Sequence, residues 1–167
     1  MSFWDLFKSQ DKTPHLNNLH EKLIDNFPDS EEDELVFLAC LAGLMARVAH
    51  VDFNVSETEI EQMKSSLMKW VKLDGQKALI ITKMAIKEMK EFQGLDTRDY
   101  CRPLVDRCNI DQRYEVLITL FSIAASDGSV DINESNEIHY ISNSLNLEKK
   151  HFIAARATIM ESLKSLK

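Results

Sequence analysis

The feature that most constrains this chain is an internal repeat. Residues 49–59 (AHVDFNVSETE) return as residues 124–134 (AASDGSVDINE), with Asp52 aligned on Asp127 and Glu59 aligned on Glu134 at an offset of 75 residues. Each copy follows an apolar run of helical character and opens a second such run. A repeat of this kind decides the architecture before any single residue does. It predicts a duplicated unit made of a helix, an acidic turn and a second helix.

Composition predicts that the elements around these turns are long helices. The chain has 167 residues, 44% of them hydrophobic, with only 4 Gly and 3 Pro, and its long stretches of Ala, Leu, Glu, Lys and Met have little strand character. We therefore expect an all-α, single-domain bundle of seven to nine helices with an internal pseudo-two-fold duplication. The expected division is a short N-terminal arm, residues 1–13, followed by one helical domain, residues 14–167.

Two helices are apolar over much of their circumference, and we expect them to form the centre of the bundle. They cover residues 30–50 and 114–126, each immediately before an acidic turn. A last helix is expected over residues 149–166. The side chains that its pattern turns inward are those of Phe152, Ile153, Ala157, Met160 and Leu163.

The N-terminal arm carries a cluster of aromatic residues. Phe3, Trp4 and Phe7 are spaced to form an apolar edge on one helical turn. We expect this edge to dock on the chain itself or on a partner protein. Membrane contact is less favoured, because it would need more apolar area or basic residues.

Net charge narrows the class of partner that the chain can have. The formal net charge is −7 and no Lys/Arg-rich block is present, which argues against nucleic acid and anionic membranes as main partners. No apolar stretch approaches the roughly 20 residues of a spanning helix, so direct membrane insertion is not expected.

The three cysteines, Cys40, Cys101 and Cys108, are odd in number and lack CxxC spacing. They are expected to be reduced and buried, in a cytoplasmic protein, with a metal or redox pair as the alternative.

Helix capping accounts for the repeated glutamates. Ser56 and Glu59 have the S-x-x-E spacing of a capping box, and Asp131 with Glu134 is its Asp counterpart. In such a box, the cap side chain accepts an amide of the first turn and the Glu reaches back to the cap amide. Both glutamates can therefore be explained without a ligand.

Capping does not explain Asp52 and Asp127, which follow helix C-termini where the dipole disfavours negative charge. Two explanations remain open at this point. Each Asp could bind loop amides in an Asx-type turn, or it could gather with Glu59 or Glu134 around a divalent cation, the one cofactor that the pattern raises. The candidate metal ligands are Asp52, Glu59, Asp127, Asp131 and Glu134.

A standard EF-hand and the common catalytic motifs are excluded. An EF-hand loop that began at Asp127 would need Gly at its sixth position and Glu at its twelfth, where the chain has Ile132 and Ile138. There is no GxSxG, P-loop, GxGxxG or HExxH pattern. The chain is therefore expected not to be an enzyme.

The second repeat resembles the tellurite-resistance TerB-like family, in its shorter and largely uncharacterised branch. That family shows an apolar helix, Asp-Gly, an apolar residue, a cap and a Glu, and then a helix that ends in a Leu-Gly-Leu-like turn. The matching segments here are residues 124–134, residues 141–147 (ISNSLNL) and Phe152, together with residues 99–104 (DYCRPL) and the opening residues 1–5 (MSFWD).

The resemblance implies a helical domain with an acidic face, tied to tellurite resistance, stress responses and membrane-linked or metal-sensing complexes. It brings no established catalytic activity. The function expected on this basis is a protein-interaction component of such a system, with divalent-metal binding or sensing as the alternative. The chain departs from the family pattern at Phe53, which replaces the Gly of the first turn, and at Asn146, which replaces a later Gly. We expect Phe53 to alter the first turn, whereas Asn can still supply a left-handed helix terminus at Asn146.

Overall fold

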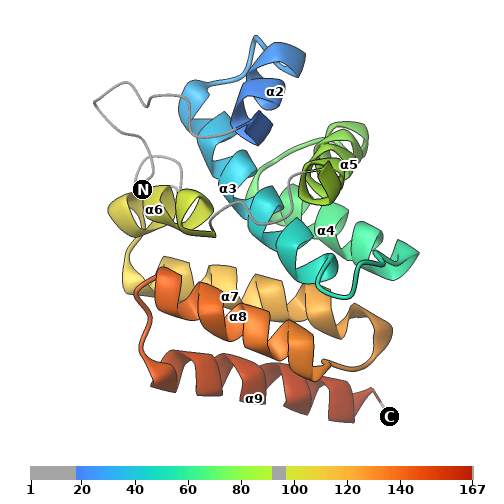
Figure 1. Ribbon diagram of the computed structural model, residues 1–167, viewed down its shortest axis with the longest axis vertical. Coiled ribbons are helices and arrows are strands. Elements are labelled where there is room, and N and C mark those ends of the chain that lie inside the picture. The colour runs from blue at the N-terminus through green and yellow to red at the C-terminus, as the bar shows by residue number, and fades with distance from the viewer. Residues whose placement is uncertain (1–17, 92–96, 167) are drawn as a thin grey trace.

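The structure, a computed structural model, describes residues 18–91 and 97–166 (Figure 1). These two ranges contain α-helices and one short 3₁₀ segment and no strand, as the composition predicts. The predicted boundary between arm and domain at residues 13 and 14 lies outside them. The elements are α2 (Asn18–Asn26), α3 (Glu32–Ala49), α4 (Glu57–Trp70), α5 (Gly75–Glu91), α6 (Thr97–Arg107), α7 (Ile110–Ala124), η1 (Ala125–Asp127), α8 (Ile132–Ser144) and α9 (Lys149–Ser165).

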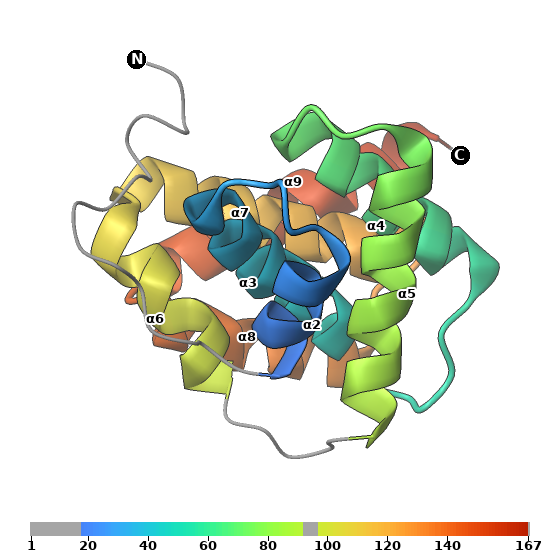
Figure 2. The same cartoon turned by 90° about the horizontal axis from the view of Figure 1, so that it is seen from above.

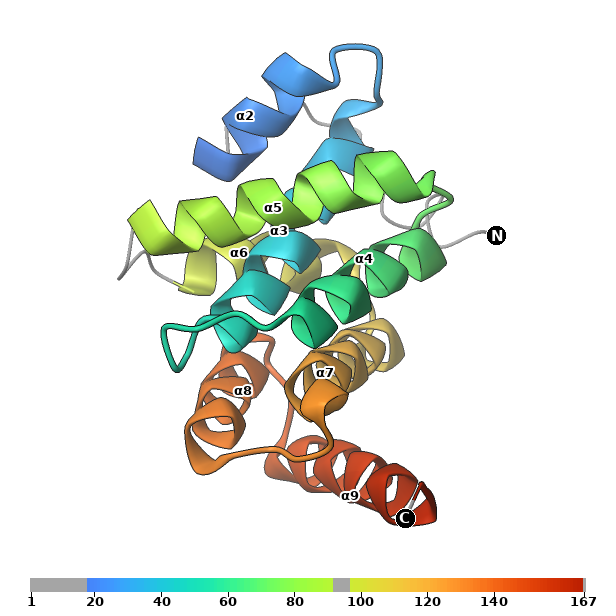
Figure 3. The same ribbon diagram turned by 90° about the vertical axis from the view of Figure 1, so that its right-hand side faces the viewer.

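Helix α3 lies at the centre of the described bundle. Of its 18 residues, 14 are buried, which agrees with the all-round apolar sequence. Helices α5 and α6 lie on either side of it in Figure 2, and α7 and α8 lie below it in Figure 3. Helices α2 and α4 also pack against it. Apolar side chains from all of these helices join one continuous core, so the described part of the chain has a single hydrophobic centre.

The duplication is longer than the repeated motif indicates. Helices α3, α4 and α5 of the first half correspond in order to α7, α8 and α9 of the second, because α5 begins at residue 75 and α9 at residue 149, close to the same offset. The packing follows the same rule in each half. Helix α5 packs on α3 and α4, and α9 packs on α7 and α8. The halves meet crosswise, with α3 against α7 and α8, and α7 against α3 and α4, which is a pseudo-two-fold arrangement.

Helix α6 joins the two halves. It packs on α3 of the first half and on α8 of the second. Its approach to α3 is close because Gly43 has no side chain, and the Tyr100 ring occupies that space. Arg107 Nη1 of α6 donates to Asp33 Oδ1 near the start of α3, at 2.9 Å. Helix α6 is therefore attached to α3 at both a buried ring and a partly buried ion pair.

The face that α9 turns inward differs from the expected one. Ala155 and Ile159 are buried, and Phe152 and Leu163 are partly buried, but Ile153 is 55% exposed and Met160 is 38% exposed. Ala157 is exposed as well. The prediction of Ile153, Ala157 and Met160 as inward residues was therefore wrong.

The physical reason is that α9 has apolar residues on two faces and that aromatic packing selects one of them. The Phe152 ring lies 5.6 Å from that of Phe121 on α7 and 4.6 Å from that of His139 on α8. These two contacts fix the rotation of α9 about its axis. Residues three and seven positions beyond Phe152 then face the core.

The end of α8 agrees with the sequence. Asn146 adopts a left-handed φ of 54°. The Leu147 amide donates to the Ser142 carbonyl at 3.1 Å, and the Asn146 amide donates to the Asn143 carbonyl at 3.0 Å. This pair of bonds is the Schellman helix ending, so Asn146 does supply the left-handed terminus in place of Gly.

None of the helices within residues 18–91 and 97–166 combines the length and the apolar content that crossing a membrane requires.

The contact between Gly43 and Tyr100 generates the first prediction. A Cβ added at Gly43 would lie 2.4 Å from the Tyr100 ring, which is fully buried and cannot swing away. Gly43→Ala should therefore lower the free energy of unfolding by about 1–3 kcal/mol, the usual cost of overpacking. Urea titration followed by circular dichroism measures this change. Gly75→Ala is the matched control, because its Cβ would come no closer than 3.4 Å to the flexible Lys64 side chain. A stability loss equal in the two variants would contradict the prediction.

Candidate functional site

The two acidic turns lie at the same end of the molecule, one above the other (Figure 3). The first connects α3 to α4 and the second connects α7 to α8 through η1. Helix α4 also packs against η1, so the turns of the two halves are neighbours in space. This end of the molecule is the candidate site predicted from the repeat.

Both predicted capping boxes are present. In the first turn the Ser56 amide donates to Glu59 Oε2 at 2.7 Å, and the Glu59 amide donates to Ser56 Oγ at 3.2 Å. In the second the Asp131 amide donates to Glu134 Oε2 at 2.9 Å, and the Glu134 amide donates to Asp131 Oδ1 at 2.9 Å. Each glutamate is thus already bound to the start of its own helix.

The remaining aspartates make the local bonds of an Asx turn. The Asn54 amide donates to Asp52 Oδ1 at 3.0 Å, and the Ser129 amide donates to Asp127 Oδ1 at 3.0 Å. Asp52 and Asp127 are both exposed. Of the two explanations for these aspartates, binding of loop amides is therefore the one for which the structure supplies hydrogen bonds.

Phe53 does not alter the first turn, contrary to the expectation. Its φ is 63°, in the same left-handed region as the φ of 98° at Gly128, its counterpart in the second turn. The turn-closing bonds also match, since the amides of Phe53 and Gly128 donate to the carbonyls of His50 and Ala125 at 2.9 Å each. The flanking caps impose this backbone on whatever residue stands there. An aromatic residue in it costs about 1–2 kcal/mol relative to Gly.

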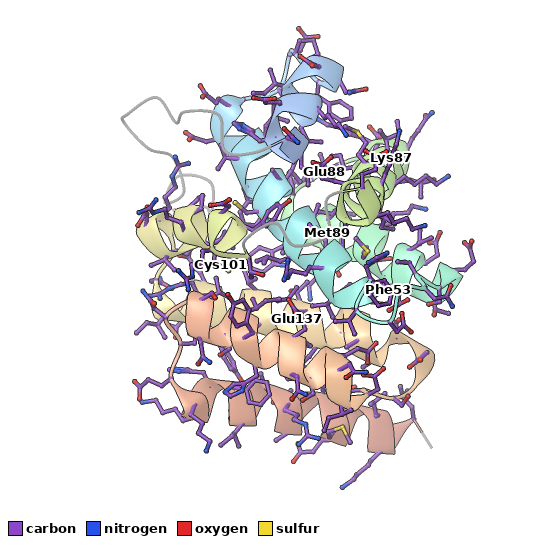
Figure 4. All side chains as sticks on the ribbon, viewed as in Figure 1. Phe53, Lys87, Glu88, Met89, Cys101 and Glu137 are labelled. Atoms are coloured by element: carbon purple, nitrogen blue, oxygen red, sulfur yellow. The ribbon has the colours of Figure 1, made fainter. Side chains whose placement is uncertain are left out.

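The strained residue is also exposed. The Phe53 side chain is 70% exposed at the tip of the turn after α3 (Figure 4). Among the residues that the structure describes, its ring contact is an edge contact with His50, at 5.5 Å between centroids. The ring therefore has little packing to offset the strain in its backbone.

The carboxyl groups of the two turns influence each other. Burial raises the pKa of Glu134 to about 7, with further contributions from the charges of Asp131, Glu59 and Asp127. Burial likewise raises the pKa of Glu59, and the charges of Asp52 and Asp127 add to the effect. Asp127 of the second half thus acts on Glu59 of the first. The electrostatic coupling runs across the pseudo-two-fold interface as well as within each turn.

These carboxylates do not form a ready coordination shell. Over residues 18–91 and 97–166, no group of three or more His, Cys, Asp or Glu side chains is placed to hold a metal ion. The capping boxes and Asx turns hold the five candidate ligands in separate local bonds. Metal binding by Asp52, Glu59, Asp127, Asp131 and Glu134 stays a prediction.

A groove between α4 and α7 is a feature that the sequence did not indicate. Its volume is about 430 Å³. The Trp70 indole spans it in part, with Nε1 donating to Thr119 Oγ1 at 3.0 Å. Most of the lining is hydroxyl or amide side chains, which carry no periodic apolar signal. The lining residues are Gln62, Ser65, Ser66, Lys69, Trp70, Glu115, Ile118, Thr119 and Ser122.

The other predicted residues are either buried or lie outside the described part of the chain. Cys40, Cys101 and Cys108 are free and buried, as expected. Burial raises the pKa of Cys40, and it raises that of Cys108 to about 11, so neither thiol is poised as a thiolate. The aromatic edge of residues 3–7 lies outside the described residues.

Comparison with known proteins identifies a family that matches most of the chain. The family described as "Tellurite resistance protein TerB" matches residues 38–157, which cover α4 to α8 and most of α3 and α9. No curated protein and no solved structure matches the chain.

The raised pKa of Glu134 generates a prediction about stability and pH. Folded Glu134, with a pKa of about 7, keeps a proton that the unfolded chain loses near 4.5. The free energy of unfolding should therefore fall as the pH rises from 4.5 to 7, by up to about 3 kcal/mol from this residue. Glu134→Gln keeps the capping acceptor but removes the proton, so its stability should fall less over this range. Glu59 should leave a residual slope in the same direction.

Urea titration at a series of pH values measures both slopes. Glu161→Gln on the exposed side of α9 is the control and should behave like the wild-type chain. The same pH dependence in Glu134→Gln and wild type would show that Glu134 is not the group that titrates.

Proposed function

Because the chain belongs to the tellurite resistance protein TerB family, we propose that it is a non-enzymatic, cytoplasmic interaction module of a tellurite-resistance or general stress-response system. Its partner in this proposal is another protein, one that can itself be membrane-associated. The described helices share one continuous core, and the groups that remain for function lie at its surface.

The observation that carries the proposal is Phe53. The second turn closes the same hydrogen bonds with Gly128, and a Cβ at Gly128 would meet nothing within 4 Å. The fold therefore has no need of a large side chain at this position. A residue that is both strained and exposed is a reason to look for function. Exposed aromatic side chains are frequent anchors of protein interfaces.

Charge favours a basic partner surface. Residues 50–59 and 125–134 together contain six Asp or Glu and no Lys or Arg. Such a surface attracts positively charged partners and repels acidic ones. Ile132, at the start of α8 beside the second turn, adds another exposed apolar side chain. The proposed contact is an apolar anchor at an acidic end of the molecule, facing Lys or Arg residues around an apolar pocket.

Substitution of Phe53 tests the proposal, because the expected effects on stability and on binding have opposite signs. Phe53→Gly should raise the free energy of unfolding by about 1 kcal/mol, since it relieves the left-handed strain. The same variant should lose proteins that the wild-type chain captures from cells of its source. Quantitative mass spectrometry of affinity-purified samples measures the capture, and thermal melting measures the stability.

Ile153→Ala is the matched control, because it removes an exposed apolar side chain from α9. It should leave the captured proteins unchanged. A Phe53→Gly chain that is more stable and keeps every captured protein would contradict the proposal.

A second candidate function is the binding of a divalent cation, favoured by one observation. Asp127 and Glu59 belong to different halves, yet the charge of Asp127 helps to raise the pKa of Glu59. A cation near both turns would relieve this repulsion. Binding would require the glutamates to leave their caps, so a cation should also change the local structure.

Calorimetry with Ca²⁺, Mg²⁺, Mn²⁺ and Zn²⁺, together with thermal melting, tests this alternative. Binding should release or absorb heat and raise the melting temperature, and Asp127→Asn should weaken both effects. No heat and no melting shift at millimolar ion would exclude it.

A further inference from the structure

Helix α6 and the α4–α7 groove are related by the pseudo-two-fold arrangement. Helix α6 packs across α3 and α8. The pseudo-two-fold arrangement relates α3 to α7 and α8 to α4, so the contact of α3 with α8 corresponds to the contact of α7 with α4. The α4–α7 groove is therefore the counterpart of the surface that α6 covers.

The side chains at equivalent positions explain why one surface is closed and the other hollow. Arg47 Nε of α3 donates to Glu137 Oε1 of α8, and Figure 4 shows Glu137 where α8 faces α3. At the same offset of 75 residues, the counterparts of Arg47 and Glu137 are Ser122 and Gln62. Both of these line the groove. The ion pair that bridges α3 and α8 is thus replaced by shorter, uncharged side chains between α7 and α4.

The chain uses its own counterpart of α6 elsewhere. Helix α2 precedes the first half as α6 precedes the second, but α2 packs on α3 and α5. Lys22 Nζ of α2 donates to Glu88 Oε2 of α5 at 2.8 Å, and the Glu88 side chain is fully buried. Moving α2 to the groove would leave this carboxylate buried without its cation, which is strongly unfavourable. A helix that binds in the groove must therefore come from outside the described helices.

We propose that the α4–α7 groove binds an amphipathic α-helix of a partner protein, in the position equivalent to that of α6 on α3 and α8. This rests on the proposed function as an interaction module and names the form of the partner. From Gln62 to Trp70 the groove follows α4 for roughly 12 Å, a little over two helical turns. Helix-in-groove docking is a common mode of peptide recognition.

The lining specifies the chemistry of that helix. Trp70 and Ile118 provide apolar contact for a large apolar side chain. Ser65 and Ser66 are short, so a helix can approach α4 closely there. Trp70 and Thr119 already satisfy each other, at 3.0 Å, so this contact does not require a polar group from the partner. Lys69 and Glu115 also line the groove, so the bound face combines a large apolar side chain with polar neighbours.

The pseudo-symmetry supplies a variant that closes the groove. Gln62→Glu with Ser122→Arg recreates across the groove the ion pair that Arg47 and Glu137 make between α3 and α8. The double variant should keep its helical content and its cooperative melting. Gln62→Glu alone is the matched control, because it introduces the carboxylate without the bridge. Ser65→Trp, on the exposed rim, is an independent block.

The probe is a displayed library of helix-constrained peptides of 11 residues, the length of α6, selected against the full chain. Enriched peptides should be amphipathic, and hydrogen exchange should show protection on α4 and α7. Calorimetry should show that the double variant and Ser65→Trp weaken the best peptide by about tenfold or more, as obstruction of an interface core does. Gln62→Glu alone should retain binding.

Four outcomes would overturn the proposal. They are no enriched peptide, unchanged affinity in both blocked variants, self-association of the wild-type chain that the double variant abolishes, and an affinity that rises about tenfold when residues 1–13 are removed. The third would assign the groove to a second copy, and the fourth would assign it to the chain's own arm. If the groove variants have no effect while Phe53→Gly still loses its captured proteins, only the groove assignment fails and the proposed function stands.

Discussion

Helix α3 has 14 buried residues among 18, and a helix with so little solvent-exposed surface is not stable until other helices surround it. Helix α7, its counterpart, packs on one part of its surface, and α2, α4, α5, α6 and α8 pack on the rest. The positions of these helices are consequently set by a shared apolar core. The acidic turns and the groove lie at the ends and edges of helices that the core already holds, so they can vary without loss of the fold.

The acidic turns show how strongly this framework determines local backbone. Each turn is held on one side by the C-terminus of a central helix and on the other by a capping box. The same carbonyl and carboxylate bonds form around Phe53 as around Gly128, although only Gly adopts that φ without cost. Surroundings that over-determine the backbone can keep a strained residue in place, and side-chain identity at Phe53 is then open to selection by a partner.

Interactions that are local in sequence could be predicted, and interactions between distant residues could not. The capping boxes at Ser56 and Asp131 and the left-handed terminus at Asn146 each depend on a few consecutive residues, and all three are present. The rotation of α9 depends on the contacts of Phe152 with two other helices, which its own apolar pattern does not contain. The groove is lined by side chains of α4 and α7, which are distant in sequence. These side chains are too short to fill the space between the two helices.

The two halves differ where a duplicated fold has the most freedom to change. In the crosswise contact between α3 and α8, Arg47 pairs with Glu137 and α6 covers both helices. This contact joins the two halves. Once that contact exists, its counterpart between α4 and α7 is not needed for the same purpose, because the core holds both helices in any case. Short hydroxyl side chains there cost little stability, since they stay hydrated at an open surface. The pseudo-two-fold thus lets one copy of a contact maintain the architecture and leaves the other copy available for binding.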